Sequence, residues 1–254
     1  MGSHHPSYPL PHYPISYWRF VMRVLGVGAH PDDLEILGAG TLAKYAKEGH
    51  EIVMCHACVG DKGHFHIPPD KLAEIRDKEA RNSAAVIGAE SITLGLPDCE
   101  VFNDRPTLIL FIDLVRRTKP DVIITHSPTD YMPDHVVVSQ LVYDASFHAG
   151  LPNWRTNEPA SEGVPPIYYM DNVACVDFQP TEYVDISEFL KTKQQMMACH
   201  ESQTVWLKEH DNLDIIQFIE DCAKVRGWQC GVPFAEAFAW TNRWPRLKPK
   251  RLLP

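Results

Sequence analysis

The sequence predicts an α/β fold in which a mostly parallel, Rossmann-like sheet carries helices on both faces. Short β-branched apolar segments alternate with stretches of about 10 to 15 residues that have helical spacing, which is typical of βαβ units. Clusters of His and Asp follow two of the predicted strands, at the sheet edge where open α/β folds bind their ligands. Together these patterns indicate one doubly covered sheet with a polar site at the carboxyl ends of its strands.

The predicted elements follow one another in a regular order. Residues 21–27 predict a buried strand, and 34–48 predict a helix with one apolar stripe, which Gly49 ends. The next strands are predicted over 51–59, 91–96 and 122–125, and the helices between and after them over 70–87, 107–117 and 135–147. Beyond Gly150 the pattern predicts strands over 167–178 and 183–186 and helices over 189–201 and 213–225.

Length and composition indicate an ordinary globular protein. The chain has 254 residues, of which 44% are hydrophobic and 22% charged, so it can bury one sizeable core. We expect a tag remnant and N-terminal arm over 1–18 and a single domain over 19–254. The basic residues between Arg243 and Arg251 are interpreted as a solvated tail.

Charge and hydropathy exclude two classes of partner. A formal net charge of −9 disfavours a nucleic-acid surface, which needs clustered cations to displace counterions from phosphates. No apolar run approaches the roughly 20 residues that span a bilayer. We therefore expect neither nucleic acid nor a membrane as partner, and predict a cytoplasmic protein.

The seven cysteines predict reduced thiols, because a chain of this size does not need disulfides to fold. Cys55 and Cys58 form a C-x-x-C pair, but it lies in a predicted strand, where residues three apart face opposite sides. We interpret the pair as structural thiols, not as metal ligands.

His30, Asp33 and His135 form the predicted metal site. The first two flank the turn between a strand and a helix, and the third begins a helix after another strand, so both turns open on one sheet edge. Two imidazoles and one carboxylate, with one position left free, are typical of a hydrolytic zinc centre. Asp32 is then available as a general base.

Other interpretations of these residues stay open at this point. An Asp at the start of a helix can simply cap it, which applies to Asp32, Asp33 and Asp134. Two imidazoles and a carboxylate also suit a non-haem iron oxygenase, although such sites are usually built on antiparallel barrels. A nucleotide site after Gly26-x-Gly28 is disfavoured, because Pro31 replaces the third glycine and acidic residues stand where a pyrophosphate would bind.

The same motifs resemble the PIG-L/LmbE family of zinc-dependent N-acetylglucosaminyl deacetylases. The resemblance rests on the AHPDD element at 29–33 with Gly38-x-Gly40, and on Pro133-Asp134-His135. Supporting matches are found at 76–79 (Arg-x-x-Glu), 200–203 (His-Glu-Ser-Gln) and 235–238 (Ala-Glu-Ala-Phe). The resemblance implies that His30, Asp33 and His135 bind one Zn²⁺ per chain, with another divalent metal as the alternative, and that Asp32 is the base.

The resemblance also implies how a substrate is held. In the family the arginine of the Arg-x-x-Glu helix contacts substrate, so Arg76 is a predicted binding residue, with a surface ion pair to Asp77 or Glu79 as the alternative. The loop 60–66 follows the second strand, where Lys62, His64 and His66 either contact the sugar or are ordinary surface residues.

One position departs from the family pattern. Many relatives carry a histidine three residues before the last ligand, where this chain has Met132, and a thioether cannot donate a hydrogen bond. The predicted replacements as oxyanion donor are His64, His126, Tyr131, His200 and His210, or a group from a neighbouring chain. Of these, His64, His126 and Tyr131 join Arg76 as predicted substrate-binding residues.

The sequence therefore predicts a zinc-dependent hydrolase that removes acetyl from a 2-acetamido sugar, as the free sugar or a conjugate. Met132 supports the alternative of a sugar-binding relative with altered catalysis. The resemblance further implies a homo-oligomer.

Overall fold

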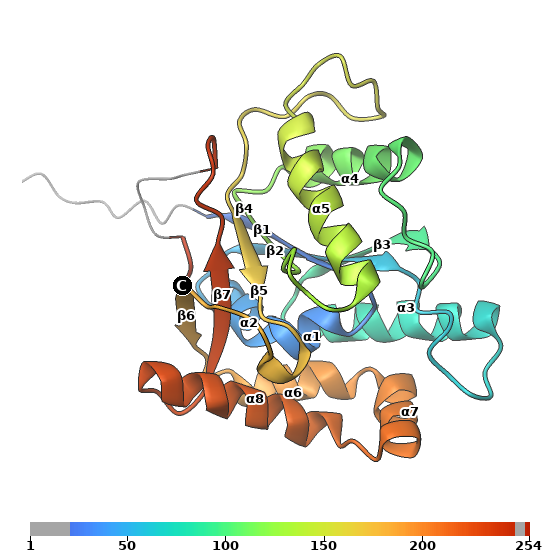
Figure 1. The fold of residues 1–254 in the computed structure, drawn as a ribbon, viewed down its shortest axis with the longest axis vertical. Helices are drawn as coiled ribbons and strands as arrows, with labels where there is room; N and C mark the ends of the chain where they lie inside the picture. Colours follow the sequence, from blue (N-terminus) through green and yellow to red (C-terminus); the bar gives the residue numbers. More distant parts are fainter. Residues whose placement is uncertain (1–20, 247–251) are drawn as a thin grey trace, which may run out of the picture.

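A computed structural model describes residues 21–246 and 252–254, and the predicted arm over 1–18 lies outside them. Figure 1 shows one central sheet between two layers of helices. The strands are β1 (Arg23–Gly28), β2 (Glu51–Cys58), β3 (Glu90–Leu96), β4 (Val122–Thr125), β5 (Ile167–Met170), β6 (Glu182–Asp185) and β7 (Ala235–Trp240). The helices are α1 (Asp33–Leu37), α2 (Ala39–Lys47), α3 (Pro69–Val86), α4 (Arg105–Thr118), α5 (Pro133–His148), α6 (Leu190–Ala198), α7 (Glu201–Asp211) and α8 (Ile215–Cys230).

The sheet has the order β3-β2-β1-β4-β5-β7-β6. Strands β1 to β5 run parallel, whereas β7 pairs antiparallel with both β5 and β6. The predicted mostly parallel α/β class is thus confirmed. The order reverses at β1, so the loops after β1 and β4 emerge side by side at the switch point of the sheet.

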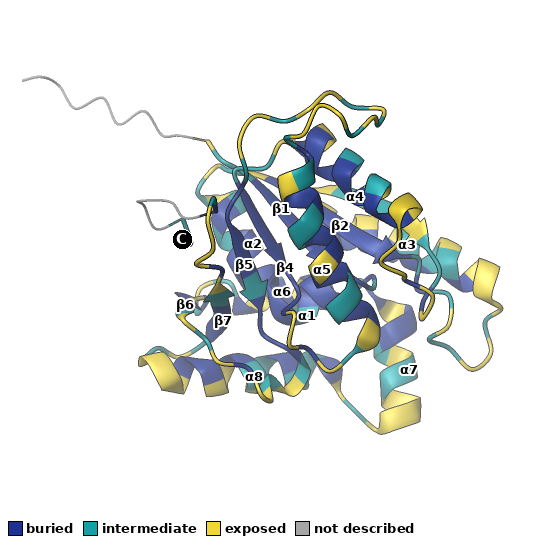
Figure 2. Ribbon diagram, turned by 45° about the horizontal axis from the view of Figure 1, so that its top comes forward, coloured by how far each residue is buried: buried dark blue, intermediate teal, exposed yellow. Residues whose placement is uncertain are grey.

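Two apolar cores form because neighbouring strand residues face opposite sides of the sheet. Val24 packs with α1, α2, α6 and α8 on one face, and Leu25 packs with α4 and α5 on the other. Figure 2 shows the central strands buried between these layers, with most exposed residues on the outer helix faces and the loops. Within residues 21–246 and 252–254, no helix is both long enough and apolar enough to span a bilayer.

The helix predicted over 34–48 is in fact two helices, which meet at Gly38 with a non-helical φ of −144° and ψ of 0°. The break turns the first N–H groups of α2 toward Glu236 on β7. The Glu236 carboxylate accepts from Gly40 N at 2.9 Å and Thr41 N at 2.7 Å. A carboxylate at this position also complements the helix dipole, so a residue 196 positions away caps α2.

Two other predictions in the C-terminal half were wrong, and two elements there were missed. The strand predicted over 167–178 stops at Met170, because the following turn holds Ala174, Cys175 and Asp177 at positive φ. The helix predicted over 189–201 ends at Ala198, where His200 is non-helical and α7 begins. Strand β7 and helix α7 were not predicted.

Of the basic residues predicted to form a solvated tail, Arg243 is exposed as predicted, but Arg246 is not. Arg246 is buried, and its guanidinium donates to Tyr143 O at 2.7 Å and Ser146 Oγ at 2.9 Å on α5. Lys248, Lys250 and Arg251 lie outside the described residues.

We predict that Gly40→Ala destabilises the protein by about 1–3 kcal/mol, because overpacking a well-filled core costs that much. A Cβ at Gly40 would lie 2.8 Å from two side-chain carbons of Ile186. Urea unfolding measures the loss. Gly38→Ala is the matched control, because its Cβ would meet only ordinary contacts, the nearest at 3.4 Å from Met170 Sδ. Equal stability of the two variants would contradict the close approach of α2 to Ile186.

Candidate metal centre and active site

The turn after β1 and the start of α5 bring His30, Asp33 and His135 together. One nitrogen of each histidine and one oxygen of Asp33 all lie within 4.8 Å of one another. His30 Nδ1 is 3.5 Å from Asp33 Oδ2, and His135 Nε2 is 3.2 Å from Asp33 Oδ1. The three residues predicted from sequence as one site therefore do converge.

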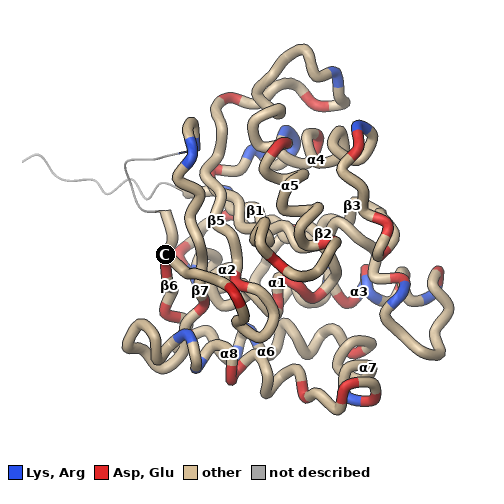
Figure 3. The backbone as a smooth tube through the Cα atoms, in the orientation of Figure 1, with Lys and Arg blue, Asp and Glu red and all other residues tan. Residues whose placement is uncertain are grey.

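These three side chains suit a divalent cation such as zinc in both geometry and chemistry. His135 Nε2 is buried and has no hydrogen-bond partner among the described residues, although it points at the carboxylate. Two imidazole nitrogens and a carboxylate oxygen are the usual ligands of a hydrolytic zinc. Figure 3 shows acidic positions gathered around α1, so a bound cation would relieve a local excess of negative charge.

The neighbouring groups set the protonation of the site. Burial would raise the pKa of Asp33, but the charges of His135 and His126 hold it well below its usual range. Burial would lower the pKa of His135, but Asp33 and Asp130 raise it to about 9. Asp33 is thus ionised at neutral pH, as a metal ligand must be, whereas His135 carries a proton that a bound cation would displace.

Two further carboxylates orient the two histidines. Asp130 Oδ2 lies 3.1 Å from His135 Nδ1, so Nε2 of that ring faces Asp33. Asp134 Oδ2 lies 3.0 Å from His30 Nε2, which leaves Nδ1 facing Asp33, and it also accepts from Cys99 N at 2.8 Å. Carboxylates in this position fix the tautomer and orientation of metal-binding histidines.

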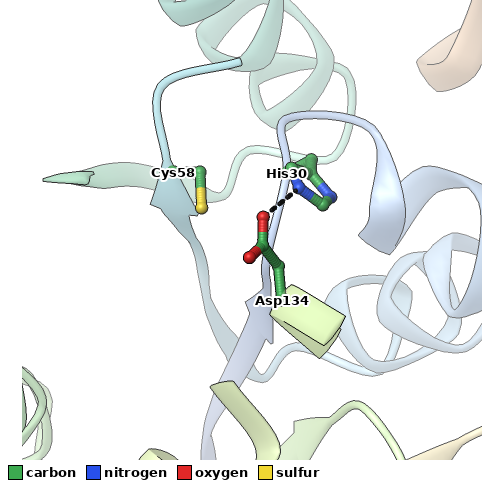
Figure 4. Close-up of side chains that lie close together, drawn as sticks. All are labelled: His30, Cys58 and Asp134. Atoms are coloured by element: carbon green, nitrogen blue, oxygen red, sulfur yellow. Dashed lines mark hydrogen bonds and ion pairs between the residues drawn. The ribbon is translucent and has the colours of Figure 1, made fainter. Parts of the chain in front are cut away.

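Cys58 completes a second possible cluster with His30 and Asp134, which Figure 4 shows. Burial raises the pKa of the Cys58 thiol, and four nearby carboxylates raise it further. A protonated thiol is a poor metal ligand. A protonated Cys58 agrees with the structural thiol predicted for this residue. Asp134 is here the hydrogen-bond partner of His30.

His126 lies behind the site, not at its surface. It is fully buried and stacks on His135, with ring centroids 3.7 Å apart and an angle of 19°. Its Nε2 accepts from Ala29 N at 2.9 Å and lies 3.1 Å from Asp33 Oδ2. These contacts fit a positioning role and do not support the predicted contact with substrate.

Asp32 is held in a conformation that L-residues rarely adopt, with φ of 139° and ψ of −21°. Arg76 clamps it: Nη2 donates to Pro31 O at 2.5 Å and lies 3.2 Å from Asp32 Oδ2, while Nη1 donates to Gly60 O at 3.4 Å. Burial, aided by the charge of Asp33, raises the pKa of Asp32 to about 6, although Arg76 opposes the shift.

Arg76 itself is only 3% exposed. The surface ion pair considered as an alternative is therefore wrong, and the burial argues against direct substrate contact. The position of Arg76 requires a glycine at residue 60. Gly60 has a φ of +76°, and a Cβ there would lie 2.5 Å from Arg76 Cδ.

The other predicted substrate residues are less buried than Arg76. Tyr131 is 56% exposed, and its hydroxyl donates to Val173 O at 3.0 Å. His64 is half-buried, and its Nδ1 accepts from the backbone N–H groups of His66 and Ile67. Their contact with substrate stays a prediction.

Met132 is the N-cap residue of α5, and its N–H donates to Asp130 Oδ1 at 2.9 Å. Of the proposed substitutes for an oxyanion donor, His200 is fully buried with its Nε2 3.2 Å from Glu35 Oε1. His210 is exposed on α7. Sequence reasoning did not assign roles to Asp130 or Glu35, although Asp130 lies in the polar run 126–135 that contains His135.

The structure matches known proteins in sequence and in fold. Residues 25–146 match the family model described as PIG-L, GlcNAc-PI de-N-acetylase. A diacetylchitobiose deacetylase of Thermococcus kodakarensis is 28% identical over 193 residues, which cover 72% of this chain and 70% of that protein. A 4-oxalmesaconate hydratase of Pseudomonas putida is 24% identical over 189 residues, which cover 70% of this chain and 73% of that protein.

Among solved structures, the N,N′-diacetylchitobiose deacetylase of Pyrococcus horikoshii superposes with a TM-score of 0.77 at 23% identity. The match covers 88% of this chain and 85% of that one. At this level of identity the likeness establishes the shared fold.

A buried polar network lies beside the site and predicts a pH dependence of stability. Burial lowers the pKa of His56 to about 4, and the charge of His200 lowers it further while Glu35 opposes the shift. An unfolded histidine titrates near 6.5. The folded state therefore keeps His56 neutral while the unfolded state takes up a proton.

We predict that this proton uptake by the unfolded state lowers the free energy of unfolding as pH falls from 6.5 to about 4, by at most about 3 kcal/mol. Glu35 and His200 titrate in the same network, so the part due to His56 is the difference between wild type and His56→Gln. Urea unfolding across this range, with chelator present to remove metal effects, measures both proteins. Identical slopes would show that His56 contributes nothing.

Proposed function

Residues 25–146 form a PIG-L (LmbE-like) domain, and on that premise we propose that the protein is a zinc-dependent hydrolase that removes the acetyl group from a 2-acetamido sugar. The observation that carries the proposal is the convergence of His30, Asp33 and His135 beside the strained Asp32. A diacetylchitobiose deacetylase among the relatives supports the same reaction.

In this proposal His30 Nδ1, Asp33 and His135 Nε2 hold the zinc, and Asp134 and Asp130 hold the two histidines in the required tautomers. Zinc bound by these ligands would lower the pKa of a bound water molecule and would stabilise negative charge on the amide oxygen of the substrate.

Asp32 carries the proton transfers. Its carboxylate accepts a proton from the attacking water, and then gives it to the nitrogen of the leaving amine. A pKa of about 6 suits both steps, because the group is ionised at neutral pH and still basic enough to take a proton. Arg76 keeps the carboxylate in place from a buried position.

A hydratase acting on a polycarboxylate, as the name of the Pseudomonas putida relative implies, fits this site less well. The loop after β3 carries Asp98, Glu100 and Asp104, and the loop after β2 offers one cation, Lys62, which pairs with Asp61 and Glu100. A substrate with several carboxylates would meet net repulsion there. Met132 favours a second candidate, a sugar-binding relative that has lost turnover.

We expect wild-type protein to release acetate from N-acetylated sugars, to lose this activity with chelator and to regain it with added zinc. Asp32→Asn should lower kcat by about 10²–10⁴-fold with zinc content unchanged, because it removes the proton acceptor and keeps the ligands. Acetate release over a panel of sugars and elemental analysis measure both quantities. Sugar binding without acetate release by the wild type would favour the second candidate.

Variants of Arg76 test whether this residue positions Asp32 or binds substrate. We expect Arg76→Lys to lower kcat by about 10- to 100-fold with KM within about twofold, because one ammonium cannot bridge Pro31 O, Asp32 and Gly60 O together. Added guanidinium should partly restore kcat of Arg76→Ala. A rise in KM with kcat intact would instead identify Arg76 as a substrate contact.

A further inference from the structure

Three aromatic side chains pack together where the loop after β2 meets α7, and we call them the aromatic platform: Phe65 and His210 are exposed, and Trp206 is half-buried. Trp206 and His210 stack along α7 with ring centroids 5.0 Å apart and an angle of 24°. Phe65, on the loop between β2 and α3, packs on His210 at 5.2 Å and is 56% exposed. Exposed aromatic clusters of this kind usually mark a binding surface.

Contacts through Gln203, Gly63 and Arg76 connect the aromatic platform with Asp32. Gln203, one turn before Trp206, donates from Nε2 to Gly63 O at 3.3 Å. A Cβ at Gly63 would lie 3.6 Å from Arg76 Nη1, and Arg76 contacts Asp32. Phe65 follows Gly63 by two residues, which is at most about 7 Å of chain. Figure 1 shows this loop reaching down beside α7.

The charges around the site restrict what the platform can bind. Among the described loops after β2, β3, β4 and β5, acidic residues greatly outnumber basic ones. The acidic residues are Asp61, Asp98, Glu100, Asp104, Asp130, Asp171 and Asp177, and the basic residue is Lys62. On α7, which carries two of the platform residues, Glu201, Glu209 and Asp211 also outnumber Lys208, so phosphate, sulfate and carboxylate groups are disfavoured next to the platform.

We propose that the aromatic platform binds an uncharged pyranose linked to the sugar that is deacetylated, so that the preferred substrates are neutral N-acetylated oligosaccharides. The C–H groups on one face of a pyranose carry partial positive charge and complement the negative face of an aromatic ring. Its hydroxyls stay in water or reach the imidazole of His210, which a purely apolar group could not use. The substrate class named here rests on the proposed deacetylase function.

Binding and turnover test the proposal separately. Calorimetry with N,N′-diacetylchitobiose and with N-acetylglucosamine measures binding to the zinc-loaded protein, and acetate release measures turnover of both sugars. The variants are Trp206→Ala, and Phe65→Leu, which removes the ring but keeps apolar volume. Trp228→Ala is the matched control, because Trp228 is 70% exposed on α8 and lies outside the platform. Thermal unfolding checks that each variant is folded.

We expect each platform variant to weaken disaccharide binding by about 3- to 10-fold, the size of one lost aromatic contact, and to leave the monosaccharide unchanged. KM for the disaccharide should rise in proportion with kcat unchanged. Any of three results would overturn the proposal. They are equal disaccharide binding by wild type and platform variants, equal losses of binding for both sugars, and the same loss of binding in Trp228→Ala. Preference for an alkyl or aryl glycoside over the disaccharide would also overturn it. Platform-dependent binding without acetate release would instead refute the proposed function alone.

Discussion

The buried carboxylate of Asp33 is the centre on which the site depends. Three imidazoles, those of His30, His126 and His135, lie within 3.5 Å of its two oxygens, and the backbone N–H of His30 donates to it at 2.6 Å. A buried carboxylate is costly unless it is paired or binds a metal. The side chains around Asp33 are therefore arranged to keep one negative charge in place, and that arrangement also creates a site for a cation.

The parallel sheet explains why so few elements supply these groups. Strands β1 and β4 are neighbours at the switch point, so His30 and His126 leave the sheet side by side. Helix α5 then returns His135 to the same point, with Asp130 and Asp134 on either side of it. His30 and His135 each contact a carboxylate of their own, Asp134 and Asp130, so these contacts orient both rings without a cation.

Residues of the C-terminal half make hydrogen bonds to the N-terminal helices that surround the candidate site. Glu236 caps α2, and the N–H and hydroxyl of Ser202 both donate to Glu79 on α3, at 2.8 and 2.7 Å. Glu79 follows Arg76 by one turn of α3. The hydrogen bonds that dock α7 on this helix therefore also help to keep Arg76 in contact with Asp32. The contacts that dock α7 on α3 are thus linked through α3 to the contacts that hold Asp32.

The sequence alone determined the fold class, the PIG-L resemblance and the cluster of His30, Asp33 and His135, because these rest on local patterns. Strand and helix periodicity and the polar runs at strand ends are visible within about ten residues. Only the tertiary structure decided that Arg76 is buried against Asp32, that His126 lies behind Asp33, and that Gly38 breaks a helix so that Glu236 can cap it. Each of these depends on a partner 44 or more positions away, and local periodicity carries no information about such partners.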